Sequence, residues 1–470
     1  MSRLLSNPVR TSSRAALGAV LLVWIVGGVA IAQQTGTTTW PQFQGDAAHT
    51  GTLPDGPEPP YRSSWIYRPG ASADQLLATP VASGSVFVVE GPDGLYAVDV
   101  RTGEELWTVE RDGPPAIPAI ATVAGTEAVV YTDGRAAEDA RVVAVSLADG
   151  TPLWDEQPPL EAESRSGVTV HDGRALVADE DGTLYSVDLD AGTVAWKVKL
   201  DEAPSGPVAA DGDSVFVVVG SPSSDGAAEV VSLSATTGEE NWSTAPNRAA
   251  SFGSLASVTD RTIVLALPNG LVYGLSTLDG SQEWSVRFNA LVSPFSAPAV
   301  DEGSAYLADT TGGLRRVVPG SGVEWLFHFN ESVIRSSPLV VGGSVLLGLG
   351  DGSIGAVSVE TGHMTWRGGS AGAPVTGLGV IGETILVARS GSGTPEVVGL
   401  VRDPAGSLVD ELSPTTPVPS DIVLWFGGAF AVVGGLLLLA FRGLAPRRFR
   451  ARDPSHDADV RMGPEDEDGP

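Results

Sequence analysis

Apolar and polar residues alternate along most of the chain in short runs rich in valine, leucine and alanine. Residues 85–89 and 95–98 are two such runs, and Asp93 and Gly94 lie between them. A period of two predicts β-strands, and an Asp-Gly pair predicts a tight hairpin turn. The same turn signal recurs at Asp181-Gly182, Asn269-Gly270, Gly312-Gly313 and Asp351-Gly352. Helical repeats would not place glycine there, so the pattern predicts an all-β fold.

A motif that ends in tryptophan recurs seven times along the chain. The seven residues are Trp107, Trp154, Trp196, Trp242, Trp284, Trp325 and Trp366, with spacings of 47, 42, 46, 42, 41 and 41 residues. A fixed period in the forties is typical of propeller blades or of two-helix repeats, and the strand pattern favours blades. The two long spacings coincide with enlarged hairpins at residues 133–140 and 221–226.

A glycine precedes the tryptophan by four residues in six of the seven repeats. These residues are Gly103, Gly150, Gly192, Gly238, Gly280 and Gly362. We interpret the glycine as the positive-φ position of the turn into the outermost strand, and the tryptophan as the side chain that fills the gap between blades. Burial of one indole would stabilise a junction by about 2–3 kcal/mol.

The number of strands predicts how the ring closes. After Trp366 the chain offers three strand-like runs, about 375–380, 383–388 and 396–401, but no fourth run with a tryptophan. An unassigned strand, residues 64–67, contains Trp65, which lies 42 residues before Trp107. Joining it to the three C-terminal runs makes an eighth blade and removes the open sheet edge. We predict an eight-bladed propeller of four-stranded antiparallel blades, with seven blades as the alternative.

The repeats, together with residues 40–51, resemble the pyrroloquinoline quinone (PQQ) repeat family. The resemblance covers about residues 40–402 and rests on seven copies in register and on the lead-in that begins at Trp40. It implies an eight-bladed propeller. The family includes quinoprotein dehydrogenases and the non-catalytic, BamB-like branch of outer-membrane assembly lipoproteins, so the resemblance leaves the activity open.

Hydrophobic segments at both ends predict export and membrane attachment. Residues 1–32 combine three arginines with an apolar run, as in a signal peptide or an uncleaved signal anchor. Residues 33–60 read as an extended lead-in that lies on the propeller (61–402), and residues 403–421 as a proline-punctuated linker. The apolar run 422–441 is long enough for a transmembrane helix.

The charges beside these segments predict their orientation. Arginines begin the tail 442–470, which ends in acidic residues and is expected to be disordered. The positive-inside rule then places the C-terminus in the cytoplasm and the propeller outside, anchored in the cell membrane. Gly427, Ala431 and Gly435 recur every four residues and are a candidate face for homodimerisation, although glycine is common in such helices.

Composition limits the classes of partner. The chain has 57 acidic and 28 basic residues and a net charge of −29, which opposes nucleic-acid binding. Residues 33–421 alone carry a net charge of −31, so a protein partner is expected to present a basic or cation-bridged surface. There is no cysteine, so disulfides and thiolate metal sites do not form.

The residues needed by a quinoprotein dehydrogenase are not evident. Such an enzyme needs an aromatic platform, a calcium cage and a carboxylate base, whereas every tryptophan from Trp65 to Trp366 is assigned to a blade junction. We therefore predict no catalytic, cofactor-binding or metal-binding residues. Arg165, Arg248 and Arg335, with neighbouring serines, are candidates for binding an anion or an acidic peptide at the channel mouth. Local ion pairs are the other interpretation.

These observations favour a membrane-anchored, extracytoplasmic propeller that acts as a non-catalytic scaffold for an unidentified protein partner. A dehydrogenase that uses PQQ and calcium is the alternative, on the strength of the repeat family. A sensor of solutes or glycans is a second alternative, although the short cytoplasmic tail has no recognisable output domain.

Overall fold

The computed structural model describes residues 39–406, apart from residues 71–75, 92, 205, 221–227, 248–254, 260, 268, 289–295, 310, 330–333, 335 and 370–371. This part of the chain is almost entirely β, with 32 strands and one short 3-10 turn, η1 (Phe43–Gly45). The signal or anchor predicted for residues 1–32, the transmembrane helix predicted for residues 422–441 and the tail 442–470 lie outside it, as does most of the linker. None of the helices in the described ranges is long and apolar enough to cross a bilayer.

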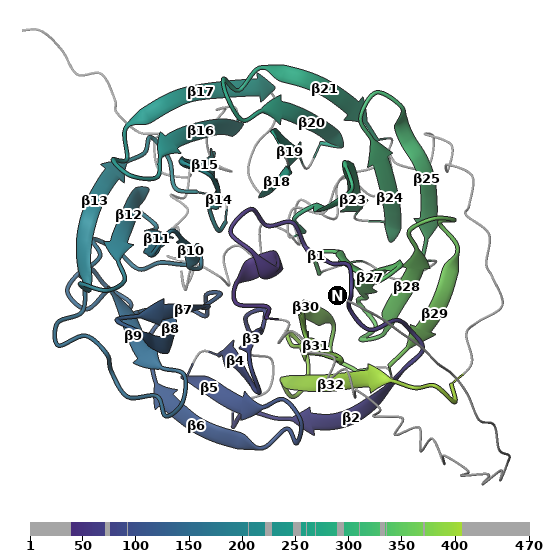
Figure 1. Ribbon diagram of the computed structural model, residues 1–470, viewed down its shortest axis with the longest axis horizontal. Coiled ribbons are helices and arrows are strands. Elements are labelled where there is room, and N and C mark those ends of the chain that lie inside the picture. The colour runs from purple at the N-terminus through teal and green to yellow at the C-terminus, as the bar shows by residue number, and fades with distance from the viewer. Residues whose placement is uncertain are drawn as a thin grey trace, which may run out of the picture. The chain divides into compact units, whose positions relative to one another are not determined.

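The strands form eight sheets that stand as blades around one axis (Figure 1). From the inside outwards, blade 1 contains β3 (Val81–Ser83), β4 (Val86–Glu90), β5 (Gly94–Asp99) and β6 (Glu105–Glu110), and blade 2 contains β7 (Ala119–Val123), β8 (Thr126–Asp133) and β9 (Arg141–Ser146). Blade 3 contains β10 (Thr169–His171), β11 (Arg174–Ala178), β12 (Thr183–Asp188) and β13 (Thr193–Lys199). Blade 4 contains β14 (Ala209–Asp211), β15 (Ser214–Val219), β16 (Ala228–Ser234) and β17 (Glu240–Asn247).

Blades 5 to 8 continue the same order around the ring. Blade 5 contains β18 (Leu255–Thr259), β19 (Thr262–Ala266), β20 (Leu271–Ser276) and β21 (Gln282–Arg287), and blade 6 contains β22 (Ala299–Asp301), β23 (Ser304–Ala308), β24 (Gly313–Val318) and β25 (Gly322–His328). Blade 7 contains β26 (Leu339–Val341), β27 (Ser344–Gly348), β28 (Ile354–Ser358) and β29 (Met364–Gly368). Blade 8 contains β30 (Val375–Ile381), β31 (Thr384–Arg389), β32 (Glu396–Arg402) and β2 (Tyr61–Tyr67).

The burial of the strands follows from their place in a blade. Neighbouring blades cover both faces of the inner strands, so β4 is apolar and buried along nearly its whole length. The outer strands face solvent on one side, and β13 accordingly alternates between exposed and partly buried residues. Continuous apolar runs and alternating runs therefore mark the inner and outer strands of the same blade.

Strand β2 closes the ring. It pairs antiparallel with β32, from Tyr61 opposite Arg402 to Tyr67 opposite Val397, and so becomes the fourth strand of blade 8 (Figure 1). The Nε1 atom of Trp65 in β2 also donates a hydrogen bond of 2.6 Å to the carbonyl oxygen of Val100 in blade 1. The prediction of eight blades closed by the N-terminal strand is confirmed, and the seven-blade alternative is wrong.

The tryptophans of the outer strands lie against the following blade. Five of them donate an indole hydrogen bond to a backbone carbonyl of that blade, at 2.6–3.1 Å: Trp65 to Val100, Trp107 to Leu147, Trp154 to Leu189, Trp196 to Ala235 and Trp242 to Thr277. Trp366 packs instead edge-to-face on Tyr61, with ring centroids 5.1 Å apart. Each such contact ties one blade to the next.

The turn glycines cover these indoles. Gly103, Gly150, Gly192, Gly238, Gly280 and Gly362 have φ between 64° and 75° and lie over Trp65, Trp107, Trp154, Trp196, Trp242 and Trp325. A Cβ atom at any of the six would approach an indole atom to 2.5–3.0 Å. Glycine is therefore required twice at this position, for its backbone conformation and for the close approach of the tryptophan.

Blade 2 departs from the prediction of four strands. Its sheet has three, and residues 151–160, where a strand containing Trp154 was expected, touch β9 only in isolated bridges at Pro152 and Pro159. Pro158 lacks the N–H group that a continuous outer strand would donate to Val142, whereas the nitrogens of Pro152 and Pro159 face away from β9. Trp154 nonetheless keeps its junction with blade 3.

The lead-in lies inside the ring, whereas we expected it to lie on the propeller (Figure 1). Its groups pair with the innermost strands of seven blades: Trp40 with Ala82, Pro41 with Ile120, the Gln42 side chain with Val170, Ala47 with Ala210, Ala48 with Val258, Thr50 with Val300 and Gly51 with Val340. Strand β1 (Thr52–Leu53) then runs parallel to β26. One segment thus satisfies backbone groups all around the axis.

The junction contact predicts a difference between two glycine substitutions. Gly192→Ala adds a Cβ 2.6 Å from the Trp154 ring, whereas Gly212→Ala meets nothing within 4 Å, although both residues have positive φ. A side chain at positive φ lowers the free energy of unfolding of both variants. We expect Gly192→Ala to lose roughly 1–3 kcal/mol more, because its Cβ overpacks the tryptophan. Urea denaturation followed by tryptophan fluorescence measures both, and equal losses would contradict the contact.

Candidate functional site

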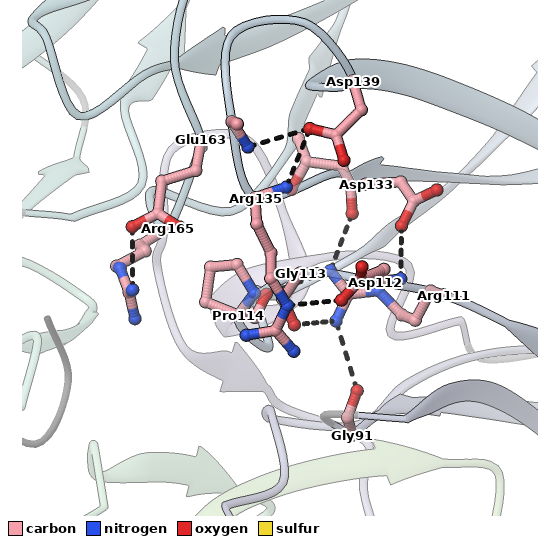
Figure 2. Close-up of polar contacts among 12 residues, drawn as sticks. Gly91, Arg111, Asp112, Gly113, Pro114, Asp133, Arg135, Asp139, Glu163 and Arg165 are labelled. Atoms are coloured by element: carbon pink, nitrogen blue, oxygen red, sulfur yellow. Dashed lines mark hydrogen bonds and ion pairs between the residues drawn. The ribbon is translucent and has the colours of Figure 1, made fainter. Parts of the chain in front are cut away.

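We define the mouth face as the end of the propeller where loops lead into the innermost strands. In blades 1 to 3 it consists of residues 90–94, 111–118, 133–141, 161–168 and 179–183, apart from residue 92. Of the three arginines proposed for the channel mouth, Arg165 lies in this face (Figure 2). Arg248 and Arg335 fall outside the described residues.

Arg165 is engaged by acidic neighbours. Its Nη2 atom lies 2.8 Å from Oε1 of Glu163 and its Nε atom 3.9 Å from Oε1 of Glu180. About a fifth of the Arg165 side chain, 21%, is exposed. An anion at Arg165 would have to compete with Glu163 for the guanidinium, so binding there stays a prediction.

A buried arginine ties blade 1 to blade 2 beneath this surface. Arg111 follows β6, and its guanidinium donates to the carbonyl oxygens of Gly91 and Gly113 at 3.2 Å, Pro114 at 3.0 Å and Thr132 at 2.9 Å (Figure 2). Its Nε atom lies 3.5 Å from Oε1 of Glu90, and both side chains are almost completely buried. The arginine therefore joins the ends of β4 and β8 to the loop between the blades.

Glu90 carries the charge that matches Arg111. Its other oxygen, Oε2, accepts the N–H of Ala116, at the far end of the same loop. Burial raises the pKa of Glu90 to about 7 and outweighs the opposing effects of Arg111 and of the Ala116 N–H. Near neutral pH the carboxyl group is thus only partly ionised.

The hairpin of blade 2 is fastened to the same loop. Asp133 accepts the N–H of Asp112 at 2.8 Å and forms an ion pair with Arg141. Arg135 pairs with Asp112, and Asp139 accepts the N–H of Arg135 (Figure 2). Every arginine in Figure 2 is consequently matched by a carboxylate of the protein itself.

Two of the serines near the proposed channel-mouth arginines serve the backbone. The Oγ atom of Ser166 bonds the N–H and carbonyl of Ala178, each at 3.0 Å, and the Oγ atom of Ser336 accepts the N–H of Gly348 at 2.8 Å. Each hydroxyl makes a hydrogen bond that a neighbouring strand would otherwise make, at the end of the second strand of its blade. These hydroxyls are occupied by structural contacts.

The mouth residues described for blades 1 to 3 do not fit PQQ and calcium. A planar quinone needs an aromatic platform, yet the tryptophans of these blades pack at the junctions. Its acidic groups need free cations, yet Arg111, Arg141 and Arg165 are engaged by carboxyl groups of the protein. Within the described ranges no three carboxylate or histidine side chains converge as a metal site requires.

The network of Glu90, Arg111 and Asp133 was not anticipated from the sequence. The signal available was a charge at the end of an apolar run, since Glu90 directly follows three buried residues of β4. Such a residue also fits an exposed hairpin turn. Its burial depends on a loop from the next blade, which local sequence does not reveal.

The closed ring of eight blades, with tryptophans hydrogen-bonded from one blade to the next, has the architecture of a PQQ-repeat β-propeller. Residues 26–187 and 180–326 match the model of a family described as outer membrane protein assembly factor BamB, and the chain belongs to that family.

Relatives with assigned names share parts of the chain. BamB of Yersinia pestis is 26% identical over 217 residues, which are 41% of this chain and 53% of that protein. BamB of Moranella endobia is 24% identical over 317 residues, 61% of this chain and 76% of that protein. A stretch of 135 residues, 28% of this chain, is 30% identical to 16% of the serine/threonine-protein kinase AfsK of Streptomyces coelicolor. The match thus spans about half the length of the Yersinia relative.

Solved structures share the fold. BamB from Moraxella catarrhalis superposes with a TM-score of 0.55 at 15% identity, over 73% of this chain and 99% of that one. A europium-containing methanol dehydrogenase superposes with a TM-score of 0.62 at 14% identity, over 77% and 98%. An assembly factor and an enzyme therefore both have this architecture.

The Glu90 carboxyl group predicts a pH effect on stability. The pKa of Glu90 is about 7 in the folded protein against an ordinary value of 4.5. The stability that the protonated carboxyl group contributes is therefore fully present below pH 4.5 and is lost as the pH rises to about 7. We expect the unfolding free energy of the wild type, relative to Glu90→Gln, to fall by a few kcal/mol over that range. Denaturant titrations at several pH values give the difference, and a constant difference would contradict the assignment.

Proposed function

We propose that the protein is a membrane-tethered, extracytoplasmic propeller that binds other proteins and catalyses no reaction itself. The observation that carries the proposal is the mouth face of blades 1 to 3, whose arginines are each held by a carboxyl group or by backbone carbonyls: Arg111, Arg135, Arg141 and Arg165. A rigid surface of this kind suits recognition by shape and charge. Membership of the BamB family supports the same reading, because its named members are assembly factors.

The proposed location rests on the terminal segments. Residues 1–32 have the pattern of a signal or anchor, and residues 422–441 that of a transmembrane helix with arginines on its C-terminal side. By analogy with the named relatives, the propeller would serve the assembly of envelope proteins or of another surface complex. Its negative charge favours a basic partner.

Two other functions are kept as alternatives. The likeness to a methanol dehydrogenase favours an enzyme on fold alone, and the match to part of AfsK favours a sensor. A dehydrogenase would bind PQQ with calcium, whereas a sensor would bind a small solute without a stable protein partner. Neither outcome is expected of a scaffold.

Photo-crosslinking in host membranes tests the scaffold directly. A photoreactive residue is placed in the full chain at Glu138 on the mouth face, at Glu239 on a rim turn or at Asp172 on the opposite end, all of them exposed or partly exposed. We expect discrete light-dependent adducts with another protein from at least one position. Adducts at none of the positions, with normal amounts of the protein, would count against a scaffold.

A further inference from the structure

The interrupted outer strand of blade 2 borders a groove beside blade 3. Between Pro152 and Pro159 the chain leaves β9 and bulges outwards, and the turn that begins β13 lies opposite (Figure 1). Residues 153–159 and 190–194 enclose a volume of about 490 Å³. That volume lies in the range of ligand sites and is ample for a few side chains of a peptide.

The groove combines an apolar lining with acidic edges. Leu153, Pro159 and Val194 supply the accessible apolar surface, and Asp155, Glu156 and Asp190 are exposed acids along it. Asp155 and Glu156 form no ion pair within the part of the chain that the structure describes, in contrast to the paired carboxylates of the mouth face. Asp190 uses one oxygen to accept the N–H of Ala124 at 2.8 Å.

Gln157 helps to order the wall of this groove. Its Nε2 atom donates to the carbonyl oxygen of Trp154 at 3.0 Å, which orients the amide. Its Oε1 atom is buried and has no hydrogen-bond partner among the described residues, so it is not offered to a ligand.

We infer that this groove takes an extended, lysine- or arginine-containing segment of a partner protein. Aliphatic side chains contact Leu153, Pro159 and Val194, and cationic side chains approach Asp155 and Glu156, with the overall charge of −29 attracting the segment. The inference rests on the proposed scaffold function and names the place and the chemistry of its partner. Because Pro158 cannot donate a hydrogen bond to β9, the strand stays interrupted and the groove exists before the segment binds.

A binding titration tests the charge requirement. The probe is a short fluorescent peptide of alternating lysine and valine, added to the purified full-length protein and followed by anisotropy. We expect Asp155→Asn with Glu156→Gln to weaken binding by about tenfold, since two exposed ion pairs are lost. The matched control, Glu239→Gln with Glu240→Gln, removes the same charge from blade 4, whose outer strand is continuous, and should change binding less than twofold, roughly. Equal weakening in both variants would overturn the inference.

Crosslinking separates failure of the groove from failure of the scaffold. With the photoreactive residue at Glu156 in host membranes, we expect a protein adduct that the variant at Asp155 reduces and the variant at Glu239 leaves unchanged. Adducts from Glu138 or Glu239 but none from Glu156 would overturn the groove and leave the scaffold standing. Adducts from no position would overturn both.

Discussion

The pairing of β2 with β32 is the constraint on which the rest of the structure depends. It joins the beginning of the propeller to its end and gives blade 8 its fourth strand, so no sheet edge remains open between the first and last blades. Trp65 extends the joint by its hydrogen bond to blade 1. The lead-in that precedes β2 reinforces the ring from within, because it pairs with the innermost strands of seven blades.

A closed ring with fixed junctions explains how charged groups come to be buried. Arg111 reaches four carbonyl oxygens and Glu90 only because blades 1 and 2 are held in register. Removing either partner would leave the other group buried without its counterpart, so the pair is costly to break. The polar groups of the mouth therefore serve the architecture, and recognition is assigned to exposed surface.

The sequence predicted more of the fold than of the site. Spacings of 41 and 42 residues between tryptophans, and the unassigned strand around Trp65, were sufficient to count eight blades and to predict their closure. The path of the lead-in was missed because its contacts use mostly backbone carbonyls, which any residue supplies. The break in blade 2 has one visible signal, Pro158, but the prediction of a fourth strand followed the repeat period instead. The pairing of Glu90 with Arg111 depends on a separation of 21 residues and on the loop between two blades, which local pattern does not encode.

The central proposal is that this PQQ-type propeller works by binding proteins and does not bind PQQ. Isothermal titration calorimetry of the purified full-length protein with PQQ, with and without calcium and at low and high salt, tests it most directly. The account predicts no saturable heat under any of these conditions. Calcium-dependent binding with a micromolar dissociation constant would contradict it and would favour the dehydrogenase.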